Sequence, residues 1–434
     1  MPSPDSSPST PTVQRREFLK TSAGLAVGAA VTTSGLSAGS YKRVMGANSR
    51  IRIANIGCGN RGMGAHLQNG IIPHKDATNI EVVAIADPWR KAREDTNAKI
   101  KEWFGREAKA FVSYKDLLAM DGIDAVMIAS PDHLHTTHLE AAAKAGKHIY
   151  VEKPLATEFD KLLRAYDAAK AAQSSGSVIQ VGTQLRSFPG IVGARDVMKS
   201  GILGSISLIQ ENRNGEKPYW YNNVGRNVQE KDVDWKEFLG DRPMRPFNSG
   251  QYGAWYGHYE FCQGAIPQWG AHFLDTVHFI MGSGFPTSCV CIGDTLTWKD
   301  EHKFTTPDCV QANWMYPEGF MLTSANNFGN SSGNTRKFFG TKGTLSLDNW
   351  NVPSYSAEGG PKRDGKIRGK VEVTPVPRPD HFRNWLDCMR SGETPHASID
   401  DGFKHAVAVL MAVVSYETGR KTSYDQKKRK ITTA

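Results

Sequence analysis

The feature that most constrains the fold is a glycine-rich turn directly after a short apolar segment. Residues 51–56 read IRIANI, and residues 57–62 read GCGNRG, a Gly-x-Gly-x-x-Gly turn. Such a turn lets the backbone approach a pyrophosphate at a helix N-terminus, where free N–H groups favour anions. A second apolar stretch, residues 80–86, ends at Asp87, near the usual place of the carboxylate that binds the adenosine ribose. We therefore expect a bound dinucleotide, and the alternative is an ordinary strand–turn–helix unit without a ligand.

Apolar strand candidates alternate with helical stretches between residues 50 and 180. Strands are expected at residues 51–56, 80–86, 124–129, 147–151 and 177–181, and helices lie between them, for example at 137–145 and 157–172. This alternation predicts a parallel, doubly wound sheet of the α/β class. In such sheets ligands lie beyond the C-terminal ends of the strands.

The pattern changes after about residue 185, where strand candidates follow one another without long helices. They lie at residues 205–213, 288–297, 308–316, 319–327, 335–339 and 344–348. This pattern predicts a second domain of the α+β class with a mostly antiparallel sheet. Helices return at residues 380–391 and 401–418, and the nearly continuous apolar sequence of the second indicates that it packs back on the first domain.

These changes divide the chain into four segments. We expect a leader over residues 1–48, a dinucleotide-binding domain over 49–185, a substrate and oligomerisation domain over 186–425, and a basic tail over 426–434. The basic run at residues 427–430 is expected to be solvated, and the remaining charges of this chain, whose formal net charge is +9, are scattered. Nucleic-acid binding is therefore not expected.

The leader has the features of an export signal. Residues 1–12 are rich in Pro, Ser and Thr, which is typical of disorder. Residues 14–20 read QRREFLK and precede an Ala, Gly, Thr and Ser stretch, which resembles a twin-arginine signal. The twin-arginine export machinery moves folded proteins, so we expect a periplasmic protein that carries a tightly held cofactor. Residues 37–39 are a candidate cleavage site; an uncleaved membrane anchor and a plain disordered tail stay open.

The six cysteines contain no Cys-x-x-Cys pair, and no His/Cys cluster has the spacing of a zinc site. No metal is therefore expected. Cys289 and Cys291 share one face of an expected strand, which is a poor geometry for a disulfide. One or two disulfides elsewhere stay open in an exported protein.

Two short motifs carry side chains suited to hydride-transfer chemistry. Residues 152–154 read EKP and follow a strand at the expected cofactor edge, where the ammonium of Lys153 can stabilise alkoxide character on a substrate. Gln268, His272 and Asp275 are spaced i, i+4 and i+7, so on a helix they share one face. His272 is the candidate general base because its ordinary pKa lies near neutrality. By spacing alone, a surface lysine and a structural histidine are the commoner outcomes.

With these motifs the chain resembles the glucose-fructose oxidoreductase / inositol dehydrogenase (Gfo/Idh/MocA) family, as a twin-arginine-exported member. The resemblance covers most of residues 50–425 and rests on the glycine turn, the EKP triplet, SPDHLH at 130–135, GTKGTL at 340–345 and the stretch from HFRNWL to SYETG at 381–419. It implies a Rossmann domain plus an α+β domain with a large open-faced, mostly antiparallel sheet, and an active site between them. It also implies NAD or NADP, a sugar, cyclitol or polyol substrate, and a homodimer or homotetramer paired through the open sheet face.

The resemblance assigns roles to individual residues. Lys153 and His272 become the catalytic pair, with Gln268 and Asp275 beside them. Many members carry Asp four residues before the histidine; Gln268 cannot supply that negative charge, and Asp275 is a candidate substitute. The cofactor is expected to contact Gly57, Gly59, Asn60, Arg61, Gly62, Asp87, Ser130, Pro131, His135, Glu152, Lys153 and Arg186. The substrate is expected to contact Lys153, Trp220, Tyr221, Tyr256 and His272.

The segment 219–261 indicates the substrate class. It holds eleven aromatic side chains, about a quarter of its residues, against 9% in the whole chain. Aromatic faces pack against the apolar C–H faces of sugar rings, which favours a carbohydrate site; a loop that packs on the domain or on a partner subunit is the alternative. Asp87 favours NAD because a carboxylate would repel a 2′-phosphate, and Arg90 leaves NADP open.

We therefore expect an exported NAD(P)-dependent oxidoreductase that acts on a CH–OH group of a sugar, cyclitol or sugar derivative. The first alternative is a redox-neutral, NAD-dependent glycosidase, which oxidises a ring hydroxyl transiently, eliminates the aglycone and returns the hydride. The second alternative is a non-catalytic sugar-binding protein of the same fold, suggested by Gln268.

Overall fold

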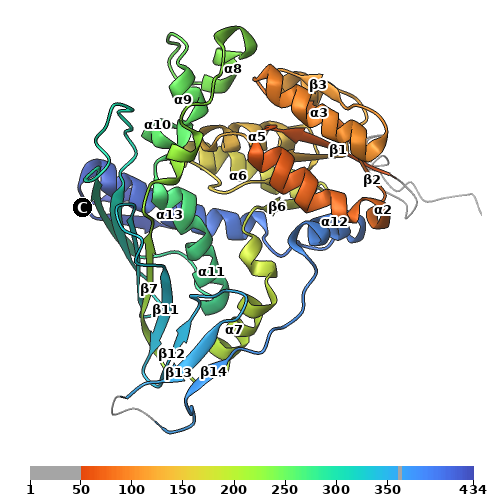
Figure 1. Ribbon diagram of the computed structural model, residues 1–434. Coiled ribbons are helices and arrows are strands. Elements are labelled where there is room, and N and C mark those ends of the chain that lie inside the picture. The colour runs from red at the N-terminus through yellow and green to blue at the C-terminus, as the bar shows by residue number, and fades with distance from the viewer. Residues whose placement is uncertain (1–49, 360–363) are drawn as a thin grey trace, which may run out of the picture. The chain divides into compact units, whose positions relative to one another are not determined.

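The computed structural model describes residues 50–359 and 364–434. The leader predicted over residues 1–48 lies outside the described residues, so the export signal stays a prediction. The described residues belong to one compact unit, which contains two sheets (Figure 1). None of the helices found in the two described ranges has the length and hydrophobicity that a membrane span requires.

The first sheet has six parallel strands in the order β3-β2-β1-β4-β5-β6. The strands are β1 (Ile51–Ile56), β2 (Ile80–Ala86), β3 (Lys109–Phe111), β4 (Ala125–Ile128), β5 (His148–Val151) and β6 (Ile179–Val181). This is the strand order of a Rossmann fold, and it confirms the predicted doubly wound sheet. Only β3 was not predicted, because it is a largely exposed edge strand, whereas the equally short β6 is buried.

Helices alternate with these strands and cover the sheet (Figure 1). They are the π-helical η1 (Asn60–Ile71), the short η2 (Ile72–His74) and η3 (Asp132–Leu134), and α2 (Lys75–Thr78), α3 (Arg90–Phe104), α4 (Tyr114–Ala119), α5 (His135–Lys144) and α6 (Phe159–Ser174). Helix α3 shows why such a segment forms a helix that packs on the sheet: its buried residues recur every four positions and so share one face. They are Ala92, Thr96 and Ile100. The helix ends at Gly105, whose φ of +74° suits glycine.

The second sheet has ten strands in the order β14-β13-β12-β11-β7-β10-β9-β8-β15-β16. They are β7 (Ile206–Asn214), β8 (Ser288–Asp294), β9 (Cys309–Met315), β10 (Met321–Asn327), β11 (Thr335–Gly340), β12 (Gly343–Ser346), β13 (Ser354–Ala357), β14 (Lys370–Glu372), β15 (Thr422–Asp425) and β16 (Lys430–Thr433). Every pair is antiparallel except β10 with β7. In β9, Val310, Ala312 and Trp314 are buried, whereas Gln311 and Met315 are exposed, so one face of this sheet is covered and the other is open.

Further helices lie between and beside the sheets. They are η4 (Gln184–Ser187), α7 (Pro189–Lys199), η5 (Tyr219–Asn223), η6 (Glu230–Asp232), α8 (Trp235–Leu239), α9 (Ser249–Gly253), η7 (Trp255–Gly257), α10 (Tyr259–Cys262), the π-helical η8 (Ile266–Gly270), α11 (Ala271–Met281), α12 (His381–Ser391) and α13 (Ile399–Thr418). Helix α13 is almost entirely buried and contacts β8 of the second sheet as well as β6 and α6 of the first. The second of the two C-terminal helices therefore packs against elements around both sheets.

The structure corrects the prediction of a basic tail over residues 426–434. Strand β16 pairs with β15, with Thr433 opposite Thr422, and β15 pairs with β8, so the C-terminus forms the edge of the second sheet. The side chain of Ile431 packs on the core, and the basic run lies in the turn between the strands and at the first residue of β16. The basic composition of this segment did not indicate strand β16, because backbone pairing with β15 and not composition stabilises it. All six cysteines are free thiols.

Candidate active site

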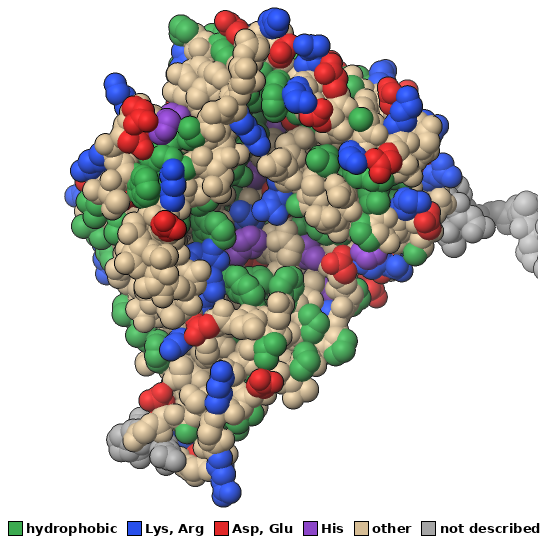
Figure 2. Space-filling view, viewed as in Figure 1, with side chains coloured by type: hydrophobic (Ala, Val, Ile, Leu, Met, Phe, Trp, Pro, Cys, Tyr) green, Lys and Arg blue, Asp and Glu red, His purple; other side chains and the backbone are tan. Residues whose placement is uncertain are grey.

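A cavity of about 520 Å³ lies at the C-terminal edge of the first sheet. Its walls come from the turns after β1, β2, β4 and β5, from η8 and α11, and from residues 219–262, here called the strap. Figure 2 shows a hollow at the centre of the viewed face, with histidine and Lys or Arg side chains on its floor. The cavity therefore lies where an open α/β sheet binds ligands.

The glycine turn forms one end of this cavity. Gly57 has a φ of +92°, and a Cβ atom there would lie 2.5 Å from the carbonyl oxygen of Ala129. A Cβ on Gly62 would collide with the carbonyl oxygen of Gly57, whereas a Cβ on Gly59 would meet nothing within 4 Å. Gly59 lines the cavity together with Asn60 and Arg61. The first and third glycines thus allow the tight turn, and the second leaves space for a pyrophosphate, so the turn fits a dinucleotide.

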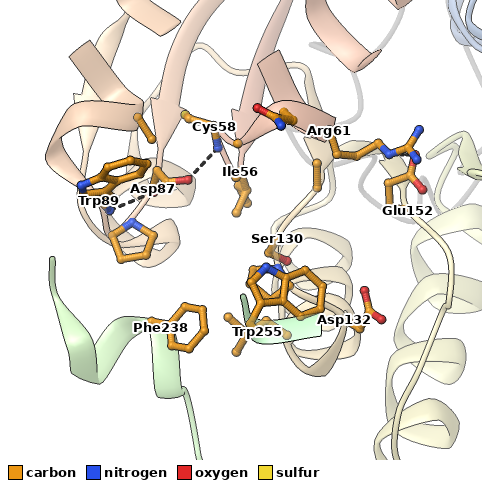
Figure 3. A pocket seen from close by; sticks show the side chains of 18 of the residues that line it. Ile56, Cys58, Arg61, Asp87, Trp89, Ser130, Asp132, Glu152, Phe238 and Trp255 are labelled. Carbon is orange, nitrogen blue, oxygen red and sulfur yellow. Dashed lines mark hydrogen bonds and ion pairs between the residues drawn. The ribbon is translucent and has the colours of Figure 1, made fainter. Parts of the chain in front are cut away.

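Asp87 follows β2 and lines the same cavity (Figure 3). Its carboxylate accepts hydrogen bonds from the backbone N–H groups of Cys58 at 2.7 Å and Trp89 at 2.8 Å. Burial raises the pKa of Asp87, and these two N–H groups act against that effect. Arg90 does not line the cavity, because its guanidinium pairs with Asp232 at 2.6 Å and with Glu94.

Glu152 and Lys153 lie deeper in the cavity, after β5. The Glu152 carboxylate is 2.9 Å from Nε2 of His66 and 3.9 Å from Nε of Arg61. Although burial opposes it, the charge of Arg61 and the hydrogen bond from His66 hold the pKa of Glu152 well below its usual range. Burial lowers the pKa of Lys153, and the neighbouring carboxylates oppose that shift. The Lys153 ammonium is therefore a buried cation in contact with the cavity.

Gln268 and His272 face Lys153 from η8 and α11. Nζ of Lys153 donates to the backbone oxygen of Gln268 at 2.9 Å and to its Oε1 atom at 3.5 Å. His272 lines the cavity, and its Nδ1 atom has no hydrogen-bond partner among the described residues. Burial and the charge of Lys153 lower the pKa of His272 well below its usual value. The imidazole is consequently neutral at neutral pH and can accept a proton.

The structure corrects the prediction that Asp275 lies beside His272. Asp275 is fully buried outside the cavity, where it pairs with Nε of Arg186 at 2.8 Å and Nδ1 of His405 at 3.2 Å. Its pKa, which burial alone would raise, is held well below the usual range by these two partners. His272 and Asp275 lie three residues apart in α11, so their side chains leave the helix in directions about 60° apart, and Asp275 points to Arg186 of η4 and His405 of α13.

Four other predicted site residues also lie outside the cavity, namely Gly62 and three residues with large side chains. Arg186 is the buried partner of Asp275 and also pairs with Asp401 at 3.3 Å. Trp220 is 1% exposed and belongs to the core, and Tyr221 donates its hydroxyl to Asp300. The predicted Tyr256 does line the cavity, together with four aromatic residues that were not predicted: Tyr219, Tyr252, Trp255 and Trp269. The aromatic composition thus indicated the segment, but not which of its faces meets the cavity.

The other predicted positions behave as follows. Ser130, Pro131 and His135 line the cavity after β4, and Gly62 lies behind the turn. Asp132 was missed as a site residue, although it belongs to the same motif. It is 3% exposed, lines the cavity and accepts a hydrogen bond from Nε2 of Gln268. Its position after a strand of the parallel sheet could have identified it as a site residue, because ligands bind at that end of the strands.

The strap lines the end of the cavity at which Asp87 and Trp89 lie. It has a small apolar core of its own, formed by Trp235, Phe238, Leu239 and Phe261. Three ion pairs join it to the first domain: Asp232 with Arg90 at 2.6 Å, Asp241 with Lys161 at 2.6 Å, and Arg242 with Glu158 at 2.8 Å. Val233 also forms a backbone bridge with Trp89, directly beyond Asp87. Phe238 and Trp255 of the strap lie opposite Asp87 and Trp89 across the cavity (Figure 3).

Two family models match this chain. Residues 51–183 match an oxidoreductase family with an NAD-binding Rossmann fold, and residues 237–346 match the GFO/IDH/MocA C-terminal domain. Together the two segments cover more than half of the chain and contain the glycine turn, Lys153 and His272.

Among curated proteins, the chain is 26% identical over 229 residues to the 2,7-anhydro-N-acetylneuraminate hydratase of Escherichia coli strain K12, covering 52% of each. It is 33% identical over 178 residues to a glycosyl hydrolase family 109 protein of Shewanella amazonensis, covering 37% of this chain and 38% of that protein. The matches span less than two thirds of the length of these relatives.

A solved structure shares the fold. The WlbA dehydrogenase from Bordetella pertussis, in complex with NADH and UDP-GlcNAcA, matches with a TM-score of 0.63 and 22% identity, over 87% of this chain and 98% of that chain. The Rossmann domain and the large sheet domain are therefore a shared architecture, as the sequence motifs implied.

Proposed function

Because the chain belongs to the GFO/IDH/MocA family of NAD-binding oxidoreductases, we propose that it oxidises a hydroxyl group of a sugar, cyclitol or sugar derivative. The observation that carries this proposal is the convergence of the glycine turn, Lys153 and His272 on one cavity. When bound, NAD accepts a hydride from the carbon that bears this hydroxyl. The names of the Escherichia coli and Shewanella amazonensis relatives support a carbohydrate substrate.

The chain's own residues supply the remaining chemistry. The neutral imidazole of His272 takes the hydroxyl proton as a general base. The Lys153 ammonium stabilises the negative charge that develops on the substrate oxygen, and its burial strengthens this effect because the local dielectric is low. Tyr256 and Trp269 provide flat apolar surfaces for the sugar ring.

Two features favour NAD over NADP, and the second also favours tight retention of the cofactor. Asp87 at the adenosine end would repel a 2′-phosphate, and Arg90, which could otherwise bind that phosphate, is paired with Asp232. The same ion pair ties the strap across the adenosine end of the cavity. We propose that a cofactor bound there leaves only when the strap moves, which suits the export that we propose from residues 14–20.

Tight retention also favours one alternative, a redox-neutral glycosidase. The Shewanella amazonensis relative is named as a glycosyl hydrolase, and a retained cofactor can return its hydride within one catalytic cycle. A non-catalytic sugar-binding role was suggested by the missing carboxylate at Gln268. That argument no longer holds, because the carboxylate of Asp132 lies next to Gln268 and accepts a hydrogen bond from it.

The experiment uses the full chain purified from the exported fraction. Denaturation releases the cofactor for identification by mass, and the native protein is incubated with free sugars and aryl glycosides. Reduction of the nicotinamide without aglycone release supports the oxidoreductase. Aglycone release without net reduction selects the glycosidase. A protein that carries no nicotinamide cofactor and binds none contradicts both, and Lys153→Ala serves as the inactive control.

A further inference from the structure

Asp132 is a buried carboxylate of the cavity that the proposed reaction does not use. It lies in η3, directly after β4, and is 3% exposed. Figure 3 shows its side chain on the cavity wall, on the same side as Glu152. A carboxylate buried this far from solvent requires a hydrogen-bond donor or a cation nearby, so its partners indicate what it does.

The side chain of Gln268 joins Asp132 to Lys153. Its Nε2 group donates to Oδ2 of Asp132, and its Oε1 atom accepts from Nζ of Lys153 at 3.5 Å. An amide has a donor end and an acceptor end, so only one orientation satisfies a carboxylate on one side and an ammonium on the other. Asp132 therefore fixes the direction in which the Gln268 carbonyl points.

The charged groups around Lys153 show why the carboxylate of Asp132 affects the charge of this lysine. The titratable and charged groups that act on Lys153 from the surrounding elements are Glu152, Asp132, Arg61, Arg213 and His272. Glu152 is already shared with Arg61 and His66. Burial lowers the pKa of Lys153 and raises the pKa of Asp132 well above its usual value, and the attraction between these two groups opposes both shifts.

We propose that Asp132 is a positioning residue that acts through the Gln268 amide to keep Lys153 charged and directed into the cavity. The pair of Asp132 and Gln268 thus supplies the negative charge that a carboxylate at position 268 would supply directly. The role in turnover rests on the proposed function, whereas the effect on the charge of Lys153 does not.

The first test measures the charge of Lys153 without any substrate. Acetic anhydride labels only the neutral amine, and mass spectrometry of the Lys153 peptide gives the labelling rate at each pH. In Asp132→Asn we expect the curve to move to lower pH, with about tenfold faster labelling at a pH below the wild-type midpoint, because a nearby carboxylate shifts a pKa by about one unit or more. The control is Asp95→Asn, which removes a carboxylate of the cavity that pairs with Lys91 instead. Equal curves for Asp132→Asn and Asp95→Asn overturn the proposal.

The second test exchanges the two groups. The double variant Asp132→Asn, Gln268→Glu keeps the number of charges and nearly the same volume, and it places the carboxylate directly beside Lys153. We expect its labelling curve to return to the wild-type pH or above it. It also remains informative where Asp132→Asn alone does not fold. A double variant whose curve stays at low pH contradicts the proposal.

Turnover gives an independent readout. Because Lys153 must be charged, activity is lost as pH rises through its pKa, so the alkaline limb of kcat/KM should move to lower pH in Asp132→Asn and return in the double variant. An unchanged limb contradicts the role in turnover. If the labelling curves shift but wild type oxidises no sugar, the proposed function fails while the inference about Lys153 holds.

Discussion

At the scale of single residues, the cavity depends on three glycines with different roles. Gly57 and Gly62 face the backbone, where a side chain would collide with carbonyl oxygens, and Gly59 faces the open cavity. The motif was readable from the sequence because its spacing encodes this geometry. The sequence does not show which glycine is needed for the turn and which for ligand binding. That distinction requires the structure, which shows the atoms around each Cβ position.

This difference predicts opposite outcomes for two alanine variants. Gly59→Ala should unfold at the wild-type temperature but bind NAD at least about tenfold more weakly, because its methyl group occupies the space left for the pyrophosphate. Gly62→Ala should lower the stability of the protein itself by about 1–3 kcal/mol, because the turn has to shift. Calorimetry for NAD binding and thermal unfolding without NAD separate the two. A Gly59→Ala protein that binds NAD normally would show that the pyrophosphate lies elsewhere.

The environment of His272 predicts a pH dependence. Its pKa is lowered, so the imidazole stays neutral, and active as a base, down to a pH below the ordinary histidine value of about 6.5. The value of kcat/KM for oxidation should therefore show no acid limb near that value and should fall only at lower pH. His272→Ala should reduce kcat by about 10²–10⁴-fold. An acid limb near the ordinary value that His272→Ala abolishes would contradict this environment.

At the scale of elements, the sequence predicted what periodicity and strand length reveal. The five largely buried strands of the first sheet and the six strands expected between residues 205 and 348 were recognised. The three-residue β3, the strands β13 and β14, and the hairpin β15–β16 were not, because their pairing partners and not their composition stabilise them. The π-helical η8 was likewise not predicted.

The strap predicts the rate at which NAD leaves. Each exposed ion pair contributes about 0.2–1 kcal/mol, so removing two of them with Asp232→Ala and Asp241→Ala should raise the NAD dissociation rate roughly two- to thirtyfold. The control is Asp167→Ala, which breaks a pair with Arg429 away from the strap. Exchange of bound NAD against isotope-labelled NAD measures the rate. Equal rates in all three proteins would mean that the strap does not retain the cofactor.

At the scale of the whole molecule, the second sheet leaves one face without helices. Val290, Ile292, Met315 and Met321 are exposed on β8, β9 and β10, with Ile292 78% exposed. Exposed apolar groups on one sheet face are typical of an interface between proteins. We propose that this face pairs two copies of the chain, as the family resemblance implied.

Ile292→Asp should therefore turn a dimer or tetramer into a smaller species, because an unpaired charge would be buried in the interface. Light scattering during size-exclusion chromatography gives the mass. The matched control is Met244→Asp, an equally apolar and exposed position on the strap. Dissociation of both variants, or of neither, would argue against this face as the interface.

The central claim is that a substrate carbon in this cavity gives its hydride to NAD with the help of Lys153. The most direct measurement is isotope transfer: the NAD-loaded protein is mixed with a sugar that carries deuterium on the oxidised carbon, quenched within one turnover, and the released cofactor is weighed. The account predicts deuterium on the nicotinamide in the wild type and none in Lys153→Ala. Product formation by the wild type with no deuterium on the cofactor would contradict it.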